Sequence, residues 1–284
     1  MKRFLKGMGW TIGIILLLWL ILAQSCMTFR KSDADARKEF TAAGVSIKLD
    51  RIVVDGHTIH YAMTGSDTLP TLFFVHGSPG SWDAFQEYMK DPDLLKRFRM
   101  VSVDRPGFGH SDYGNPEHLG RQSELISPLF TLLENHQPKY LIGHSLGGPM
   151  VVKLAADNVG MFSGMVILAG SIDPGEEKPE RWRPWLFKTP LNYFVPGAMR
   201  PSNEELWYLK KDLVALEGDF AHITCPVYLV HGTVDPLVPF GNTEYGKKML
   251  VNARSVDIIP LPGANHFIPW TRFEVIKRVL LGLP

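Results

Sequence analysis

Short, continuous runs of apolar residues recur along the chain and alternate with segments of mixed polarity. Six of these runs end in glycine-rich or turn-rich stretches: TLFFVHG, RMVSVDRPG, KYLIGHS, GMVILAG, PVYLVHG and SVDIIPLPG. Runs of this length are typical of parallel strands that are buried on both faces. Between them lie segments compatible with helices, at residues 118–136, 146–158, 240–250 and 271–282. The alternation predicts an α/β fold, with a mostly parallel sheet flanked by helices.

Two segments do not follow this alternation of strands and helices. SIKLDRIVVDGHTIHYAMTG, at residues 46–65, predicts an antiparallel hairpin, because Asp55-Gly56 is a dipeptide favoured in tight hairpin turns. Residues 172–222 lack any buried-strand pattern and are rich in prolines and aromatic residues. We interpret them as a small helical cap, inserted between two strands of the sheet.

The N-terminus has the pattern of an export signal. Lys2, Arg3 and Lys6 precede an apolar run over residues 10–23, and Gln24-Ser25-Cys26 follow it. Residues 1–25 are therefore predicted to be a signal peptide or an uncleaved membrane anchor, which needs about 20 apolar residues. A lipid or an uncleaved anchor would attach the rest of the chain to a membrane of a bacterial cell envelope, outside the cytoplasm, which is the expected location; plain secretion stays open as an alternative.

The segment LAQSC resembles a bacterial lipoprotein signal, and this resemblance implies that Cys26 is acylated after cleavage. Only Cys225 would then remain as a thiol, so no disulfide within the chain is expected. Residues 26–45 are charged and have no strong apolar period, and they are predicted to form a tether. Residues 46–284 are predicted to form one domain that includes the cap.

Composition narrows the class of protein. The chain has 284 residues, of which 45% are hydrophobic and 21% charged, as in ordinary globular proteins. The formal net charge is +1, which gives no indication of a nucleic-acid partner. The sequence has neither an HExxH motif nor a glycine-rich phosphate loop after the first strand, so neither a metal nor a nucleotide cofactor is expected. The expected partners are a small-molecule substrate and a membrane.

One serine lies between glycines where an apolar run meets a helical segment. In LIGHSLGG, Gly143-x-Ser145-x-Gly147 has the strand–turn–helix context of a nucleophile elbow. A serine hydroxyl needs a neighbouring base that a third group orients. Candidates should follow strands, since parallel sheets bring active residues to the carboxyl ends of their strands. Asp235 follows VYLVHG, and His266 follows the last strand-like run.

The chain resembles the α/β-hydrolase family across roughly residues 50–284. The motifs that carry the resemblance are HGSPGSW at 76–82, DRPGFGHS at 104–111, GHSLGG at 143–148, HGTVDPLVP at 231–239 and GANH at 263–266.

The resemblance implies a role for each candidate residue. Ser145 is the nucleophile, His266 the general base and then acid, and Asp235 the group that orients the imidazole. The backbone N–H groups of Ser78 and Leu146 form the oxyanion hole.

The expected activity is hydrolysis of an ester, or a related acyl bond, of a small apolar substrate. Family members that resemble epoxide hydrolases and haloalkane dehalogenases have aspartate at the elbow, whereas serine favours acyl transfer. Three alternatives stay open: an aminopeptidase similar to proline iminopeptidases, whose HGGPG resembles HGSPG here; a cofactor-free haloperoxidase or lyase; and a binding module without turnover.

The cap adds two further open questions. Its aromatic residues either line an acyl pocket or pack the cap on the sheet; they are Trp182, Trp185, Phe187, Tyr193, Phe194, Trp207 and Tyr208. Glu204 and Glu205 either bind a substrate amine or begin a helix.

Overall fold

The structure is a computed structural model, and it describes residues 2–284. An eight-stranded sheet forms its centre, in the order β1-β2-β4-β3-β5-β6-β7-β8. β2 pairs antiparallel with β1 and β4, and the other neighbours pair parallel. All six apolar runs form strands, and five of these strands are buried as predicted. The prediction of burial is wrong for the sixth, Val256–Leu261, because it lies at the edge of the sheet and buries only Leu261. The strands are β1 (Lys48–Val54), β2 (His57–Thr64), β3 (Thr71–Val75), β4 (Arg99–Val103), β5 (Lys139–His144), β6 (Gly164–Leu168), β7 (Val227–Gly232) and β8 (Val256–Leu261).

The predicted hairpin is formed by β1 and β2. Val54 pairs with His57, which leaves Asp55 and Gly56 as a two-residue turn. Both turn residues have positive φ angles, 50° and 82°, as a type I′ turn requires.

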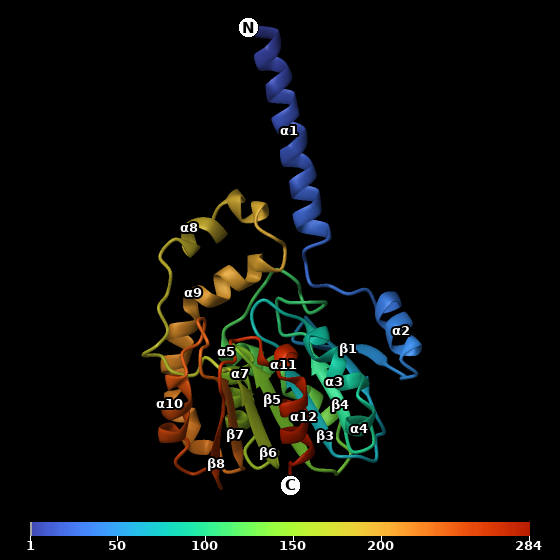
Figure 1. The fold of residues 1–284 in the computed structure, drawn as a ribbon, viewed down its shortest axis with the longest axis vertical. Helices are drawn as coiled ribbons and strands as arrows, with labels where there is room; N and C mark the ends of the chain where they lie inside the picture. Colours follow the sequence, from blue (N-terminus) through green and yellow to red (C-terminus); the bar gives the residue numbers. More distant parts are fainter. Residues whose placement is uncertain (1) are drawn as a thin grey trace.

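Helices cover both faces of the sheet (Figure 1). One face packs against α5 (Leu119–Ile126), α6 (Pro128–Leu132), α7 (Gly147–Asp157) and α10 (Gly241–Met249). The other packs against η1 (Trp82–Phe85), α3 (Gln86–Lys90), α4 (Pro92–Leu95) and α12 (Phe273–Leu281), which the short α11 (Ile268–Thr271) precedes. The helix predicted over 118–136 is divided at Pro128, which has no backbone N–H to continue the ladder.

Successive side chains of a strand point to opposite faces of the sheet, so neighbouring residues of each strand contribute to different apolar layers. In β3, the Phe73 ring meets Phe130 of α6 with centroids 5.0 Å apart. Its neighbour Phe74 stacks on Phe85 of η1, at 4.7 Å. Both faces of the central strands are thus buried, which explains their continuously apolar sequence.

The segment between β6 and β7 lies over the carboxyl ends of the strands (Figure 1). It holds α8 (Arg183–Phe187), η2 (Pro190–Phe194), α9 (Met199–Leu216) and η3 (Glu217–His222). α9 buries one side against the body, through Leu209, Leu213 and Leu216. In contrast, α8 buries none of its residues.

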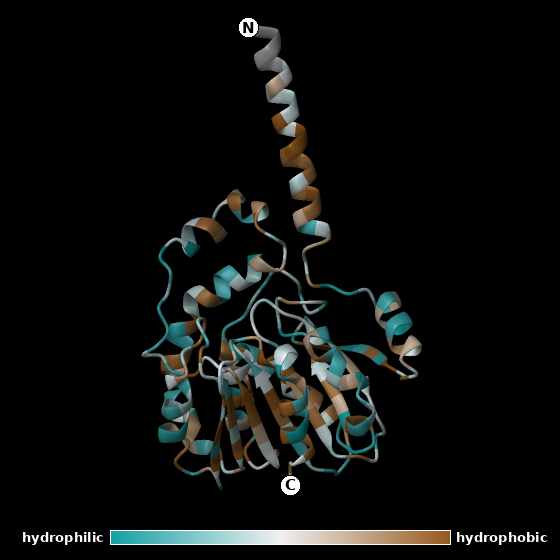
Figure 2. Ribbon diagram, in the orientation of Figure 1, coloured by the Kyte–Doolittle hydropathy of each residue, from teal (hydrophilic) through white to brown (hydrophobic). Residues whose placement is uncertain are grey.

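The N-terminal helix α1 (Lys2–Ser25) projects away from the body (Figure 1). In Figure 2 the part of this helix nearer the body is coloured mostly as hydrophobic. Within the described part of the chain, Gly7–Ser25 is one segment that is long and apolar enough to cross a membrane.

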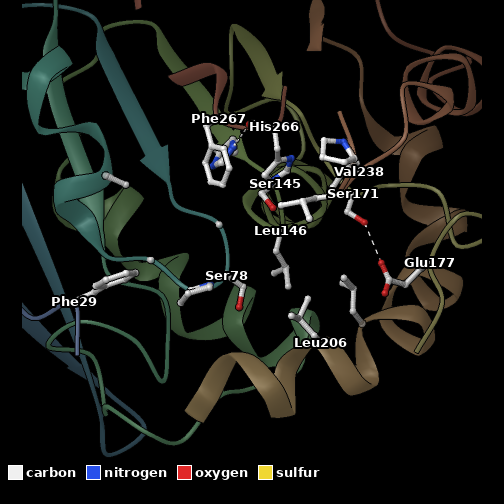
Figure 3. Close-up of a pocket in the computed structure, with 18 of the residues that line it drawn as sticks. Phe29, Ser78, Ser145, Leu146, Ser171, Glu177, Leu206, Val238, His266 and Phe267 are labelled. Atoms are coloured by element: carbon white, nitrogen blue, oxygen red, sulfur yellow. Dashed lines mark hydrogen bonds between the residues drawn. The ribbon is translucent and has the colours of Figure 1, made fainter. Parts of the chain in front are cut away.

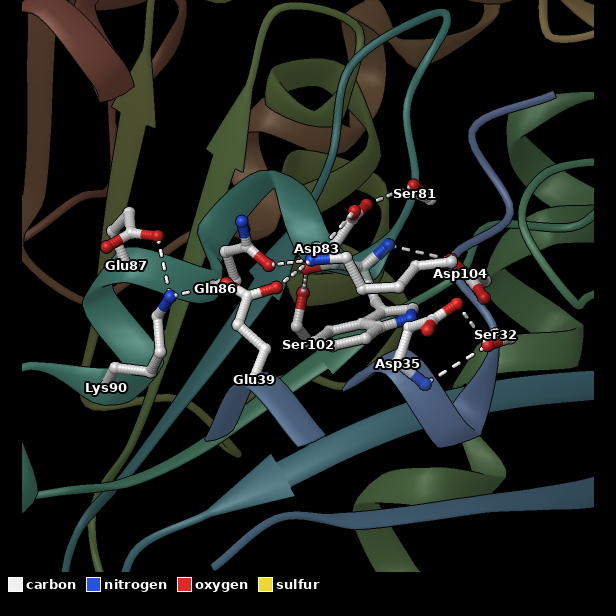
Figure 4. Close-up of polar contacts among 12 residues, drawn as sticks. Ser32, Asp35, Glu39, Ser81, Asp83, Gln86, Glu87, Lys90, Ser102 and Asp104 are labelled. Carbon is white, nitrogen blue, oxygen red and sulfur yellow. Dashed lines mark hydrogen bonds and ion pairs between the residues drawn. The ribbon is translucent and has the colours of Figure 1, made fainter. Parts of the chain in front are cut away.

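Part of the segment predicted to be a tether packs on the body. Its helix α2 (Asp33–Ala42) buries Ala36 and Phe40, and the Phe40 ring lies 6.0 Å from that of Trp82. Glu39 of α2 also binds the ammonium group of Lys90 at 2.7 Å (Figure 4). The sequence lacked a strong apolar period here because α2 buries only two side chains.

Candidate active site

Ser145 occupies a sharp turn between β5 and α7. Its φ angle is 55°, a left-handed conformation that is rare for residues other than glycine. The Ser145 N–H donates to the carbonyl of Leu168 at 2.9 Å, which holds this backbone. A Cβ atom at Gly143 would overlap the carbonyl of Gly147, and one at Gly147 would overlap the carbonyl of Val75. The glycines of the motif therefore allow strand and helix to meet closely enough to expose Ser145.

His266 and Asp235 form a hydrogen-bonded pair beyond the ends of β8 and β7. The distance from His266 Nδ1 to Asp235 Oδ2 is 2.7 Å. The other carboxylate oxygen, Oδ1, accepts from the N–H groups of Leu237 and Val238 at 2.8 and 2.9 Å. This turn fixes the carboxylate, whose side chain is 0% exposed.

Two opposing effects act on the pKa of Asp235. Burial tends to raise this pKa, but hydrogen bonds from His231, His266 and the Val238 N–H together hold it below its ordinary value. Asp235 therefore carries a negative charge beside the His266 ring at neutral pH. That charge favours the Nδ1–H tautomer of His266, which leaves Nε2 free to accept a proton.

Ser145 and His266 line one cavity, where Figure 3 shows them side by side. Among the described residues, no hydrogen bond joins the Ser145 hydroxyl to the His266 ring. Such catalytic contacts often tighten only when substrate is bound.

The loop after β3 brings a second set of donors to this cavity. Ser78 and Leu146 both line it, and in the described part of the chain neither backbone N–H donates to another protein group. Leu146 directly precedes α7, so its N–H lies at the positive end of a helix dipole. Two such free donors could bind an oxygen that becomes negatively charged.

A buried arginine, Arg105, binds backbone carbonyls of the loop after β3. Arg105 donates from Nε to the carbonyl of His76 and from Nη2 to the carbonyl of Gly77, both at 3.0 Å. The same guanidinium forms a bidentate pair with Glu205 of α9, and the two side chains are 0% and 2% exposed. Ser78 Oγ also donates to Ser202 Oγ of α9 at 3.0 Å. The cap helix is thus bonded to the loop that carries a predicted oxyanion donor.

Sequence reasoning missed this role of Arg105. Arg105 lies in a motif that was noted for its family resemblance, and Glu205 was expected to bind an amine or begin a helix. Instead Glu205 lies inside α9, and its carboxylate binds Arg105. Their separation of 100 residues gives no local pattern that could have revealed the pair.

Two other histidines near the site remain neutral. Burial, together with the Arg105 charge, lowers the pKa of His76 to about 3. Burial, together with His266, likewise lowers the pKa of His144 to about 3. The His144 ring donates from Nε2 to the carbonyl of His266 at 3.1 Å, so it supports the loop of the candidate base.

The cavity has a volume of about 1000 Å³. Its apolar lining includes Leu206 and Leu209 of α9, and Val238, Phe267 and Trp270 of the sheet domain. None of the seven cap aromatics considered from the sequence lines it. Of the two alternatives left open, the one in which they line an acyl pocket is therefore excluded, and the cap contributes aliphatic side chains of α9 to the cavity instead. Charged side chains also line it: Lys31, Asp83, Glu176, Glu177, Lys178, Glu180 and Arg183.

The remaining predicted positions lie away from the cavity. Cys26 is exposed just after α1, and Cys225 is partly buried before β7, where burial raises the pKa of its thiol. In the described part of the chain, no three His, Cys, Asp or Glu side chains converge as metal ligands would.

Solved structures share this fold. A membrane phospholipase A, a bacterial virulence factor, aligns with a TM-score of 0.61 at 19% identity, covering 100% of this chain and 99% of that one. The haloalkane dehalogenase DatA from Agrobacterium tumefaciens aligns with a TM-score of 0.66 at 17% identity, covering 84% and 97%. At these identities the similarity shows the fold alone.

Curated relatives and a family profile agree with the fold. The uncharacterized hydrolase YugF of Bacillus subtilis is 25% identical over 264 residues, which cover 80% of this chain and 94% of that protein. The bifunctional esterase/perhydrolase DCH of Acinetobacter calcoaceticus is 27% identical over 272 residues, covering 80% and 96%. The profile described as "Alpha/beta hydrolase family" matches residues 72–277. The chain is therefore an enzyme of the alpha/beta hydrolase family.

Proposed function

We propose that the protein is a serine hydrolase that cleaves carboxylic esters through an acyl-enzyme. The main support is the 2.7 Å hydrogen bond between His266 and the buried Asp235, on the cavity that Ser145 also lines. The esterase activity in the name of the Acinetobacter relative agrees with this proposal.

In the first half-reaction, Ser145 Oγ attacks the ester carbonyl carbon while His266 Nε2 takes the hydroxyl proton. The carbonyl oxygen becomes an oxyanion, which the N–H groups of Ser78 and Leu146 stabilise. One such donor is worth about 3 kcal/mol of barrier in other serine hydrolases. The C–O bond to the alcohol then breaks, the alcohol takes the proton from His266, and Ser145 keeps the acyl group.

In the second half-reaction, water replaces the alcohol. His266 takes a proton from water, whose oxygen attacks the acyl carbon and forms a second oxyanion. Collapse of this intermediate releases the carboxylic acid and returns the proton to Ser145. Asp235 stays ionised throughout, because its own hydrogen bonds hold its pKa low.

A second candidate activity is perhydrolysis, in which hydrogen peroxide replaces water in the second half-reaction and a peracid leaves. The relative that is named an esterase/perhydrolase favours this candidate. Peracid formation from a short ester and hydrogen peroxide would test it on the same preparation.

We also propose that α1 is an uncleaved anchor that attaches the enzyme to a membrane. Trp19 and Gln24 of α1 donate hydrogen bonds to η2 and to the residue after it, contacts that cleavage before Cys26 would remove. These contacts favour the anchor over the lipoprotein. Mass spectrometry of the membrane-extracted protein would separate them, because a lipoprotein begins at an acylated Cys26 and an anchored protein retains residues 2–25.

Hydrolysis of p-nitrophenyl esters of increasing acyl length would test the proposed activity. We expect turnover by the full chain in detergent, and its loss in Ser145→Ala. Ser123→Ala is the matched control, since this buried serine of α5 has no hydrogen-bond partner for its hydroxyl among the described residues. Equal turnover by Ser145→Ala and the wild type would refute the proposal.

A further inference from the structure

Large apolar side chains are exposed on the part of the cap near α1. We call residues 182–194, which span α8 and η2, the cap tip. In this segment Trp182, Trp185, Leu191, Tyr193 and Phe194 are 50, 66, 38, 50 and 38% exposed. Figure 2 shows these apolar stretches of the cap at the same end of the molecule as α1. Water-exposed aromatic clusters of this kind mark interaction surfaces.

Side chains of α1 satisfy the backbone at the end of the cap tip. Trp19 donates from Nε1 to the carbonyl of Phe194 at 2.8 Å. Gln24 donates from Nε2 to the carbonyls of Tyr193 and Val195, at 2.8 and 3.0 Å. Irregular backbone is tolerated near hydrocarbon only where its polar groups are paired within the protein. These three bonds pair the carbonyls of Tyr193, Phe194 and Val195 in this way.

The contacts also set the depth of the cap tip. Trp19 lies six residues before Ser25, the end of the apolar stretch Gly7–Ser25. At 1.5 Å per residue, the Trp19 contact is about 9 Å along the helix from that end. Elements that lie in a membrane interface are buried by about 5–10 Å. When Gly7–Ser25 spans a bilayer, η2 therefore lies at the boundary between headgroups and acyl chains.

The charges around the cap tip suit an anionic leaflet. Residues 176–200 carry five basic side chains and three acidic ones: Lys178, Arg181, Arg183, Lys188 and Arg200, with Glu176, Glu177 and Glu180. The Arg200 guanidinium lies over the Tyr193 ring, 4.3 Å from its centroid. Tryptophan and tyrosine with nearby basic residues are typical of membrane interfaces, where cations attract anionic headgroups.

Residues of the same surface line the cavity. Phe29 and Lys31, which follow α1 closely, line the cavity, as do Glu180, just before the cap tip, and Arg183 within it. Figure 3 shows Phe29 and Ser145 on opposite sides of this one cavity. The chain after α1 and the cap thus both border the cavity that Ser145 lines.

We propose that the cap tip inserts into an anionic leaflet, and that the substrate is an acyl ester of a bilayer lipid. The proposal rests on the ester hydrolase activity and on the anchor proposed above. The lipid's acyl chain enters the cavity along its apolar lining, while the headgroup remains beside the basic residues.

The test compares two esters on the full chain, reconstituted in vesicles of phosphatidylethanolamine and phosphatidylglycerol. One is a phosphatidylglycerol with a fluorogenic acyl ester in the vesicle, and the other is soluble p-nitrophenyl butyrate. In Trp185→Ser/Leu191→Ser we expect loss of about tenfold or more on the lipid ester, because two large apolar side chains no longer insert. Hydrolysis of the soluble ester should change less than about twofold, since neither residue lines the cavity.

Leu132→Ser is the matched control, because Leu132 is an exposed leucine of α6, outside the cap. It should leave both rates unchanged. Equal loss on the lipid ester in this control and in the cap-tip variant, or no loss in the latter, would overturn the proposal.

A second measurement detects insertion without activity. The difference in emission between the wild type and Trp185→Phe isolates Trp185, and brominated acyl chains in the vesicle should quench it. An unquenched difference would overturn the proposal even if the enzyme is active. If wild-type protein hydrolyses neither ester, the ester hydrolase proposal fails, whereas the quenching result still decides whether the cap tip inserts.

Discussion

The loops at the carboxyl edge of the sheet and the cap tip differ in what holds them. Asp235 is fixed by hydrogen bonds from its own turn and from His266, and the His231 ring lies 3.5 Å from its carboxylate, all within the sheet domain. The cap tip, in contrast, is bonded to α1 and buries no residue of α8. The first region keeps its geometry wherever the domain folds, whereas the second depends on a helix that we propose lies in a membrane.

α9 separates the two regions. Through Glu205 it holds Arg105, and through Ser202 it meets Ser78, so it belongs with the site. The two parts of this cap therefore differ: α9 supports the candidate active site, whereas the cap tip faces what we propose is the membrane. Substitutions in the first region can therefore be compared with matched substitutions elsewhere in the molecule.

The largest effect is expected for Asp235→Asn. An amide here would present a donor to His266 Nδ1 and favour the wrong tautomer, so kcat should fall about 10⁴-fold, as in other serine hydrolases. Asp212→Asn in α9 is the matched control, because Asp212 binds His118 Nδ1 at the same 2.7 Å outside the cavity. Steady-state kinetics should show less than about a twofold change for it. A similar kcat for both variants would contradict the assigned role of Asp235.

Glycine substitutions should separate the elbow from the cap. At Gly143 an added Cβ would overlap the Gly147 backbone, whereas at Gly218 of η3 it meets nothing within 4 Å. Gly143→Ala should cost about 3 kcal/mol of stability or more and abolish most turnover, because neither backbone segment can move freely. Gly218→Ala should be neutral. Chemical unfolding with parallel ester assays measures both, and a stable, active Gly143→Ala would show that the elbow is not close-packed.

Arg105→Lys tests the bond between α9 and the β3 loop. Lysine keeps the charge but cannot donate to both loop carbonyls and Glu205 at once, so we expect kcat to fall about 10–100-fold with KM nearly unchanged. Arg99→Lys is the control: Arg99 is also buried and multiply bonded, but it lies at the amino end of β4. Equal stability losses with kcat lowered only in Arg105→Lys would identify a positioning residue. Equal kcat losses would leave Arg105 with a structural role only.

The smallest effect concerns pH. The pKa of His144 is about 3 in the folded protein, against about 6.5 in an unfolded chain. Between these values the unfolded state binds more protons, so stability decreases as pH falls below 6.5. His144→Gln should reduce this slope by about 1.4 kcal/mol per pH unit between pH 5.5 and 4. Urea unfolding at several pH values checks it, and an unchanged slope would mean that His144 is not buried as a neutral ring.

Much of the sheet domain could be predicted from the sequence because its signals are local. Strands buried on both faces read as continuous apolar runs, and the Asp55-Gly56 turn needs two positive φ angles. The steric reason for Gly143 is also local, because an added Cβ would overlap Gly147, whereas Gly147 is restricted by the distant Val75. The predicted residues Ser145, His266, Ser78 and Leu146 line one cavity, with Asp235 bonded to His266, and their catalytic roles stay predictions.

What could not be predicted depends on contacts between distant segments. Trp19 and Phe194 are 175 residues apart, and Arg105 and Glu205 are 100 apart. The cap aromatics look alike in the sequence whether they line a cavity, pack on the sheet or face outward. Only the position of α1 and α9 decides between these outcomes.

Labelling with a fluorophosphonate, followed by mass spectrometry of peptides, tests the central claim that Ser145 is the nucleophile. We expect a single adduct, on the peptide that contains Ser145. This adduct should be absent from Ser145→Ala and retained in Ser123→Ala. An adduct on another residue, or labelling that persists in Ser145→Ala, would contradict the account.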